Sequence, residues 1–233
     1  MGYLKTTIAS RSSIKRFSHN ARLDRAIDLV APVPDDRILD YGCGEGTFLR
    51  RLHAREARAA LCGFEPRGGD GSPRRTPEIE TLDGIYGSVE EIADFRPTKI
   101  VCLEVLEHLH SEAQREALSN FRRLLRNDGL IVVSVPIEIG PASVCKNLVR
   151  KAVNQPHRGI NLRNVVLSLF GWTSRIERDL EEPYISSHIG FDYRDLQEIF
   201  RAEGFRPRRR YSPFPGLGPM INSQLFLVAR IGG

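Results

Sequence analysis

Residues 37–46 read Arg37-Ile-Leu-Asp-Tyr-Gly-Cys-Gly-Glu-Gly46, an apolar run that stops at closely spaced glycines. Such a short run predicts a buried strand, and Phe48, Leu49 and Leu52 mark the inner face of a helix that follows it. In an open parallel sheet, ligands bind at the carboxyl ends of the strands, where the chain turns into the next helix. Glycine lets the backbone of such a turn approach a ligand closely, because no Cβ stands in the way. The turn is therefore the first candidate site.

The charges around this turn distinguish two classes of adenosine cofactor. A dinucleotide site would continue the pattern Gly42-x-Gly44 with a third glycine at position 47, which is Thr. Asp40 and Glu45 flank the turn with carboxylates, and these would repel a diphosphate. S-adenosylmethionine carries an ammonium and a sulfonium but no phosphate. The turn therefore favours this methyl donor.

The remainder of the chain alternates apolar runs with stripes at helical spacing. Further strands are predicted over 59–64, 85–89, 100–103, 130–135, 206–211 and 224–231. Further helices are predicted to end near Pro32, to carry the apolar stripe from Ala117 to Leu125, and to begin at Asp192. This alternation is typical of an α/β fold in which helices cover both faces of a mostly parallel sheet.

We expect one domain over residues 1–233, with an N-terminal helical cap over 1–32. The alternation breaks after the fifth strand, over 137–190, where two short helix-like pieces (144–153 and 163–171) lie among basic and aromatic residues. Because this insertion follows a strand on the ligand side of the sheet, we predict a helical lid over an acceptor pocket. For 144–153, contact with an anionic membrane surface is the second interpretation.

Four motifs resemble those of class I S-adenosylmethionine-dependent methyltransferases. They are residues 38–46, Gly63-Phe-Glu-Pro66, Val101-Cys-Leu-Glu-Val-Leu-Glu-His-Leu109 and Leu124-Leu-Arg-Asn-Asp-Gly-Leu130. The motifs occur in order between Arg37 and Pro136, and the similarity continues more loosely over 192–231. The resemblance is to the broad group that acts on small molecules. It implies a seven-stranded Rossmann-like sheet whose last strand is antiparallel, with S-adenosylmethionine as the cofactor.

The resemblance also implies roles for individual residues around the cofactor. The methionine part would meet Asp40, Gly42 and Gly44, the ribose Glu65, and the adenine Ser88 and Val89. The fourth strand would contribute Leu103, Glu104 and the nearby His108. Tyr41, Cys43 and Pro66 are also expected to bind the cofactor. His19 and Arg22 could cover the cofactor from the N-terminal segment. The chain departs from the family at Ser88, where many members have Asp. It also has Thr98 and Lys99 where an acid often precedes the fourth strand, which we interpret as a change in strand-edge packing.

Structural roles compete with these assignments. Glu104 and Glu107 could be acids that favour the start of a helix, and for Glu107 we prefer that interpretation. His108 fits a packing or capping role better than proton transfer. Cys43 and Cys102 are expected to fill small apolar spaces.

Methyl transfer to a hydroxyl benefits from a general base, whereas transfer to a carboxylate does not. The best base candidate is His188, which precedes the helix at Asp192, although ordering of its loop explains it equally well. His157 is a weaker candidate, and Tyr193 could orient an acceptor. Aromatic and basic residues in the insertion suit an acceptor with an apolar and a negative portion. A hydroxyl or carboxylate oxygen of a sugar, a quinone or phenolic compound, or a lipid-linked intermediate would fit.

Composition limits the alternatives. The four cysteines lack metal-ligand spacing, so no metal is expected, and reduced thiols are typical of the cytoplasm, where we place this protein. The net charge of +5 suits anionic partners, so an RNA methyltransferase is one rival function. Against it, the fourth strand runs into Leu103-Glu-Val-Leu rather than the Asn/Asp-Pro-Pro-aromatic signature of base-amine methyltransferases. A non-catalytic cofactor-binding protein is the second rival. The sequence leaves the oligomeric state open.

Overall fold

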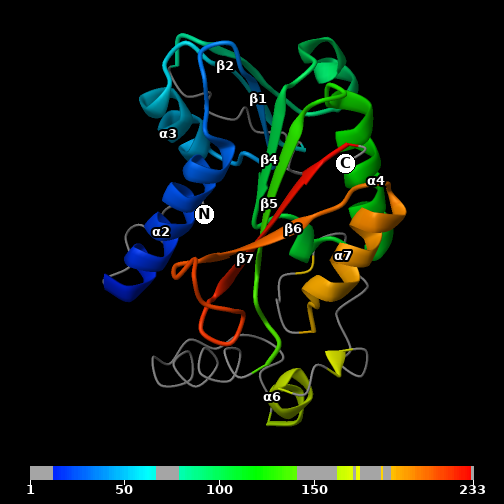
Figure 1. Cartoon of the computed structure of the whole chain (residues 1–233). Coiled ribbons are helices and arrows are strands. Elements are labelled where there is room, and N and C mark those ends of the chain that lie inside the picture. Colours follow the sequence, from blue (N-terminus) through cyan, green and yellow to red (C-terminus); the bar gives the residue numbers. More distant parts are fainter. Residues whose placement is uncertain are drawn as a thin grey trace. The chain divides into compact units, whose positions relative to one another are not determined.

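The computed structural model describes residues 13–66, 79–140, 162–169, 172–173, 185 and 190–231. These residues form a seven-stranded sheet together with α-helices and short 3-10 helices (Figure 1). The strands are β1 (Arg37–Tyr41), β2 (Ala60–Phe64), β3 (Leu82–Tyr86), β4 (Lys99–Leu103), β5 (Leu130–Pro136), β6 (Arg208–Ser212) and β7 (Gln224–Arg230). The helices are α2 (Ser13–Val30), α3 (Thr47–Arg55), η1 (Glu90–Phe95), η2 (Leu106–His108), α4 (Ser111–Leu124), α6 (Leu162–Leu169) and α7 (Tyr193–Ala202).

The strand order in the sheet is β3-β2-β1-β4-β5-β7-β6. The chain runs outward from β1 to β3 and then crosses back to β4, and β1 is parallel to both of its neighbours, β2 and β4. Such a reversal of strand order creates the crevice in which α/β proteins bind ligands. The neighbours β6 and β7 are joined by residues 213–223 without a crossover helix, which requires an antiparallel pair. The predicted Rossmann-like sheet, mostly parallel with one antiparallel end strand, is confirmed.

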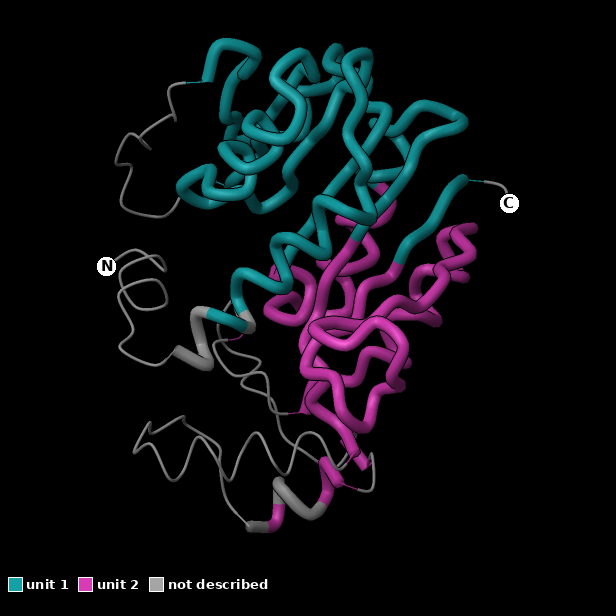
Figure 2. Tube along the Cα trace, turned by 60° about the vertical axis from the view of Figure 1, so that its left-hand side comes forward, with its two compact units in different colours: residues 1–103, 120–132, 228–231 teal, residues 104–119, 133–227, 232–233 magenta. Residues whose placement is uncertain are grey.

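The chain divides into two compact units, which Figure 2 colours separately. Unit 1 comprises residues 1–103, 120–132 and 228–231, and unit 2 comprises residues 104–119, 133–227 and 232–233. In unit 1, the Tyr41 ring packs against Phe64 at 4.4 Å and edge-on against Phe121 at 4.9 Å between ring centroids. In unit 2, Phe200 and Phe205 pack with their centroids 5.9 Å apart. Each unit thus has an aromatic cluster of its own.

Most predicted elements lie where the apolar pattern places them, but the third strand does not. The prediction of a strand over 85–89 is wrong in its bounds, since β3 ends at Tyr86. The Glu91 carboxylate accepts hydrogen bonds from the backbone N–H groups of Gly87 (3.1 Å) and Ser88 (3.0 Å). Because those two N–H groups point to a side chain, they are not available to a neighbouring strand. Val89 instead precedes the 3-10 helix η1.

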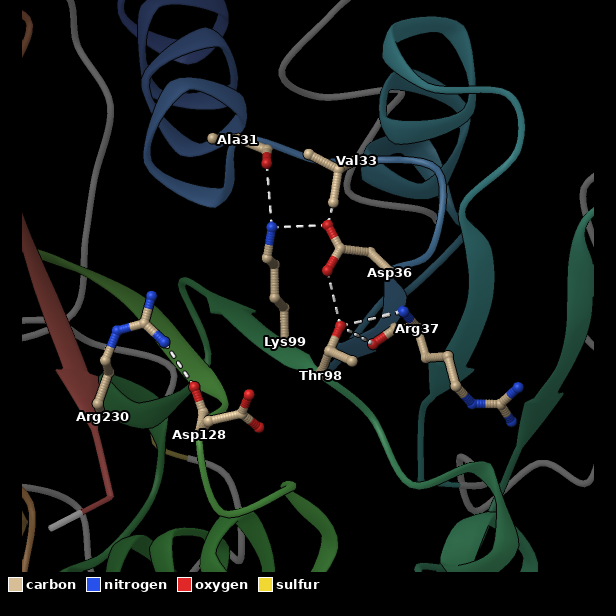
Figure 3. A network of polar contacts seen from close by, with 8 residues as sticks. All are labelled: Ala31, Val33, Asp36, Arg37, Thr98, Lys99, Asp128 and Arg230. Atoms are coloured by element: carbon tan, nitrogen blue, oxygen red, sulfur yellow. Dashed lines mark hydrogen bonds and ion pairs between the residues drawn. The ribbon is translucent and has the colours of Figure 1, made fainter.

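A buried polar network joins the amino ends of β1 and β4 in unit 1 (Figure 3). The Lys99 ammonium forms an ion pair of 2.6 Å with Asp36 and donates to the carbonyl of Ala31 at 3.0 Å. The Thr98 hydroxyl donates to the other Asp36 oxygen at 2.8 Å and accepts from the backbone N–H of Arg37 at 3.1 Å. Thr98 and Lys99, which stand where the family often has an acid, thus hold the amino ends of β1 and β4 together through Asp36.

The insertion after the fifth strand is described only in part. The helix α6 corresponds to the predicted piece at 163–171, and the backbone N–H of Gly140 donates to the carbonyl of Ser168 at 3.0 Å. The other predicted piece, 144–153, lies outside the described residues. The lid therefore stays a prediction.

Candidate functional site

The turn after β1 has a backbone that only glycines adopt easily. Gly42, Gly44 and Gly46 have φ values of 84°, 53° and 72°, all in the left-handed region that L side chains rarely adopt. A Cβ added at Gly44 would meet no heavy atom within 4 Å, so this part of the turn borders open space. The glycines therefore form a backbone turn that is open on the side of Gly44; we call this turn the glycine cradle.

Hydrogen bonds fix this turn to the end of the neighbouring strand β2. The backbone N–H groups of Gly42 and Cys43 both donate to the Phe64 carbonyl, at 2.7 and 3.1 Å. The N–H of Gly44 donates to the Glu65 carboxylate at 2.7 Å. The turn after β1 and the residues at the end of β2, which the sequence assigned to the same cofactor, thus lie in direct contact.

Close packing behind the turn depends on Gly63, which the sequence analysis quoted within a motif but did not single out. A Cβ at this position would lie 2.8 Å from the Cys43 sulfur and 2.9 Å from Ile85 Cγ1, closer than real Cβ contacts. A glycine inside an otherwise apolar strand is itself the sequence signal of such a close approach. Cys43 is buried, in agreement with its expected role as a small apolar filler.

Asp40 is the most unusual residue of the site. Its side chain is 3% exposed, and its Oδ2 atom has no hydrogen-bond partner in the described part of the chain. Burial, and secondarily the nearby Glu65 carboxylate, raises the pKa of Asp40 to about 7. A buried carboxylate without a partner is costly, and such groups concentrate at functional sites. A cationic ligand would satisfy it.

Residues beside β3 and β4 complete the same edge of unit 1. Ser88 and Val89 follow β3, which pairs in parallel with β2, and Val89 is buried. Leu103 ends β4, which pairs in parallel with β1. Because the carboxyl ends of parallel neighbours meet at one edge of a sheet, these residues lie along the edge that carries the turn and Glu65. Pro66, directly after Glu65, is exposed.

The two N-terminal residues that could cover the cofactor contact one another. An Arg22 guanidinium nitrogen lies 2.9 Å from the Nδ1 atom of His19, and the Arg22 side chain is buried. Both belong to α2 in unit 1. Their contact with a bound cofactor stays a prediction.

In unit 2, Glu104 has a strained backbone. Its φ of 56° is unusual for a residue with a side chain. Its N–H donates to the Ser134 carbonyl at 3.1 Å, and the Gln224 amide donates to its carboxylate at 2.8 Å. These contacts fix the first residue after β4 in a single orientation. Strain of this kind is often found where a residue serves a ligand rather than the fold.

Glu107 and His108 have roles that the sequence left open. Glu107 is fully buried and lies in the first turn of the three-residue helix η2, as the preferred interpretation of a helix-start acid expects. The Nδ1 atom of His108 lies 2.6 Å from the Ile185 carbonyl, and the Ile185 N–H donates back to the His108 carbonyl at 2.9 Å. A carbonyl only accepts, so Nδ1 carries the proton. This contact agrees with the packing role preferred for His108.

The other acceptor-side candidates are only partly described. His188 and His157 lie outside the described residues, so the base stays a prediction. Tyr193 is the first residue of α7 and is buried, with the Arg209 guanidinium 5.3 Å from its ring centroid. Asp192 caps this helix as expected, since its carboxylate accepts from the N–H of Arg194 at 2.8 Å. Within the described ranges, no three His, Cys, Asp or Glu side chains are grouped as a metal site.

The features of unit 1 fit S-adenosylmethionine. The glycine cradle leaves space at Gly44, Asp40 places a buried carboxylate beside it, and Glu65 adds a second acid. Independently, residues 14–208 match the family model of a methyltransferase domain. The chain belongs to the methyltransferase domain family. The predicted class of enzyme is thereby confirmed.

Solved structures share the fold of this methyltransferase. It is similar to 1,6-didemethyltoxoflavin-N1-methyltransferase of Burkholderia thailandensis, with a TM-score of 0.58 and 17% identity over 99% of this chain and 86% of the other. It is also similar to magnesium protoporphyrin IX methyltransferase of Synechocystis PCC 6803, with a TM-score of 0.55 and 14% identity over 99% and 97% of the two chains. Both of those proteins were crystallised with S-adenosylhomocysteine.

A third similar structure is a SAM-dependent methyltransferase from Archaeoglobus fulgidus, with a TM-score of 0.58 and 14% identity over 98% of this chain and 97% of the other. At such identities the likeness establishes the shared fold. No curated protein sequence matches that of this methyltransferase.

Proposed function

We propose that this methyltransferase transfers the methyl group of S-adenosylmethionine to a small-molecule acceptor, with the cofactor held at the turn after β1. The observation that carries the proposal is Asp40, whose buried Oδ2 atom has no hydrogen-bond partner among the described residues. A carboxylate in that state favours a positively charged guest. S-adenosylmethionine supplies two positive groups, whereas a dinucleotide would place a diphosphate beside two acids.

Different residues of unit 1 would contact different parts of the cofactor. The backbone of Gly42 and Gly44 would border the methionine part, with Asp40 facing its ammonium. Glu65, already held by the Gly44 N–H, would accept hydrogen bonds from the ribose hydroxyls. Ser88 and Val89 would border the adenine. The remaining candidates for this site are Tyr41, Cys43, Pro66 and Leu103.

The cofactor, when bound, supplies an electrophilic methyl group, so the protein contributes mainly alignment. Transfer requires the acceptor atom about 3 Å from the methyl carbon, on the side away from sulfur. We also propose Glu104, which follows β4 directly in the chain, and His108 as cofactor-binding residues, because the family resemblance implies this role for both. His188 would take the proton of a hydroxyl acceptor.

We propose an oxygen atom as the methyl acceptor, from a hydroxyl or carboxylate of a sugar, a quinone or phenolic compound, or a lipid-linked intermediate. Two proteins of the same fold are named for small-molecule acceptors, didemethyltoxoflavin, with N1 as the position in its name, and magnesium protoporphyrin IX; these names support the small-molecule class and not the choice of oxygen. The basic insertion favours an acceptor with a negative portion. We also place the protein in the cytoplasm, because the spacing of its four cysteines favours reduced thiols over a disulfide framework.

Incubation with methyl-labelled S-adenosylmethionine and a panel of sugars, phenols, carboxylates and RNA tests this function. Labelling of a small molecule, lost in the Glu65→Ala variant, is the expected result. Labelling of RNA alone would show that the acceptor is a nucleic acid and not a small molecule. Cofactor binding without labelling of any acceptor would favour a non-catalytic protein.

The role of His188 is tested separately. The His188→Ala variant should lower turnover of a hydroxyl acceptor while the affinity for S-adenosylmethionine stays as in the wild type. Unchanged turnover would remove His188 as the base.

A further inference from the structure

The connection between β6 and β7 exposes an unusual amount of apolar surface. Of the eight large apolar side chains that are exposed in the described residues, four lie within 213–223: Phe214 (48%), Leu217 (45%), Met220 (66%) and Ile221 (59%). Folded proteins rarely gather such side chains on one short loop, and a contiguous apolar patch marks an interaction site. We call residues 213–223 the apolar loop; it is orange to red in Figure 1.

The apolar loop is held in shape by one buried side chain. Asn222 is fully buried, and its Oδ1 atom accepts from the Phe214 N–H at 2.7 Å. Its amide nitrogen donates to the carbonyls of Phe214 (3.0 Å), Leu217 (2.7 Å) and Gly218 (3.1 Å). A side chain that satisfies four backbone groups fixes the path of the loop. The exposed apolar side chains therefore belong to a loop whose backbone is held in a defined conformation by hydrogen bonds.

The strand that leads into the apolar loop is basic on its outer face. Arg209 turns toward α7, where its guanidinium donates to Gln197 and lies over the Tyr193 ring. Alternation along the strand points Arg208 and Arg210 to the opposite face, and both are exposed. At about 3.3 Å per residue, the Cα atoms of Arg208 and Arg210 lie roughly 13 and 7 Å before the end of β6 at Ser212.

This arrangement matches the layers of an anionic membrane surface. Interfacial segments insert their apolar residues about 5–10 Å below the lipid headgroups, and basic residues behind them meet the anionic phosphates. A second copy of the chain is the less favoured partner. β6 is an edge strand of the sheet, and pairing it with another β6 would bring arginines of like charge together.

We propose that the apolar loop and the outer arginines of β6 form a docking surface for anionic lipid bilayers. None of the described helices has the length and apolarity to cross a membrane. The docking surface lies in unit 2 and involves none of the residues proposed to bind the cofactor. Its failure and that of the proposed function are therefore distinguishable.

Flotation of the full chain with lipid vesicles at about 0.1 M salt tests this surface. The protein should float with vesicles that contain phosphatidylglycerol and far less with vesicles of phosphatidylcholine alone. The double variant Met220→Ser/Ile221→Ser should weaken vesicle binding about tenfold or more. The double variant Arg208→Gln/Arg210→Gln should weaken binding to the anionic vesicles roughly fivefold for each arginine removed.

Matched controls separate this surface from general stickiness. Val33 is 51% exposed in unit 1, so Val33→Ser removes exposed apolar surface outside the apolar loop and should leave vesicle binding unchanged. An unchanged affinity for S-adenosylmethionine shows that the loop variants are folded. The proposal is overturned if the wild type does not float, or if both double variants float as it does. It is also overturned if light scattering shows a dimer that Met220→Ser/Ile221→Ser separates.

Discussion

Replacement of Asp40 by asparagine should make the ligand-free protein more stable near pH 8 and make it bind S-adenosylmethionine more weakly. The side chain is 3% exposed, and burial together with Glu65 raises its pKa to about 7 from an ordinary value of 3.8. A group whose pKa is raised on folding favours the folded state fully below its unfolded pKa. That contribution declines as the pH rises toward the folded pKa and is lost above it.

The size of the effect follows from the two pKa values. At about 1.4 kcal/mol for each pH unit, the difference between 3.8 and about 7 corresponds to roughly 4 kcal/mol of lost stability between pH 4 and pH 8. Asparagine cannot ionise, but its buried amide needs hydrogen bonds, which costs about 1–3 kcal/mol where they are missing. The Asp40→Asn variant should therefore gain about 1–3 kcal/mol over the wild type at pH 8 and gain nothing at pH 4.

Urea unfolding from pH 4 to pH 8 measures this difference, with Asp35→Asn as an exposed control that should not change the pH profile. Calorimetry should show S-adenosylmethionine bound about 10- to 100-fold more weakly by Asp40→Asn, through loss of a charge-assisted hydrogen bond. Wild-type affinity should rise with pH up to about 7, because Asp40 must ionise to pair with the ammonium. The reasoning is refuted if the variant is less stable than the wild type at pH 8 and keeps its affinity.

Three further substitutions separate cofactor binding from support of the fold. Glu65→Ala should weaken S-adenosylmethionine binding by about 1–3 kcal/mol in calorimetry, since Glu65 is placed to accept hydrogen bonds as a carboxylate; unchanged affinity would exclude it from the site. Gly63→Ala forces a Cβ to 2.8 Å from the Cys43 sulfur and should cost about 1–3 kcal/mol in urea unfolding, whereas Gly216→Ala, with open space around it, should cost little; equal losses would contradict this packing. Lys99→Met leaves Asp36 buried without its cation and should lose about 3–5 kcal/mol of stability. Lys99→Met/Asp36→Asn should restore a part of it, because asparagine carries no charge and can still accept a hydrogen bond from Thr98; no recovery would show that the unpaired charge is not the cause.

The order of the elements could be predicted from the sequence because burial in a parallel sheet imposes apolar runs. β1, β4 and β5 are buried along most of their length, and their bounds agree with the apolar runs to within a residue or so. β3 lies at the edge of the sheet, and its residues are only partly buried, so an apolar pattern specifies it poorly. The Glu91 carboxylate, five residues beyond Tyr86, accepts hydrogen bonds from the two backbone N–H groups that follow the strand, and the apolar pattern does not reveal this contact.

The candidate site also has features that the sequence predicted and features that it did not. Glycine spacing and acids at strand ends predicted that the turn and Glu65 belong together, because both are local patterns that parallel topology brings to one edge. The state of Asp40 could not be predicted, since its burial depends on the packing of the whole unit. The strain at Glu104 was equally hidden, because a positive φ leaves no mark on sequence at a residue other than glycine.

Crystals grown with S-adenosylhomocysteine test most directly whether the adenosyl cofactor occupies the edge formed by β1 and β2. The expected density places the ribose hydroxyls against the Glu65 carboxylate and the amino group toward Asp40, beside the backbone of Gly44. A ligand bound elsewhere, or a dinucleotide whose diphosphate rests on residues 42–46, would contradict the charge argument from which the site was derived.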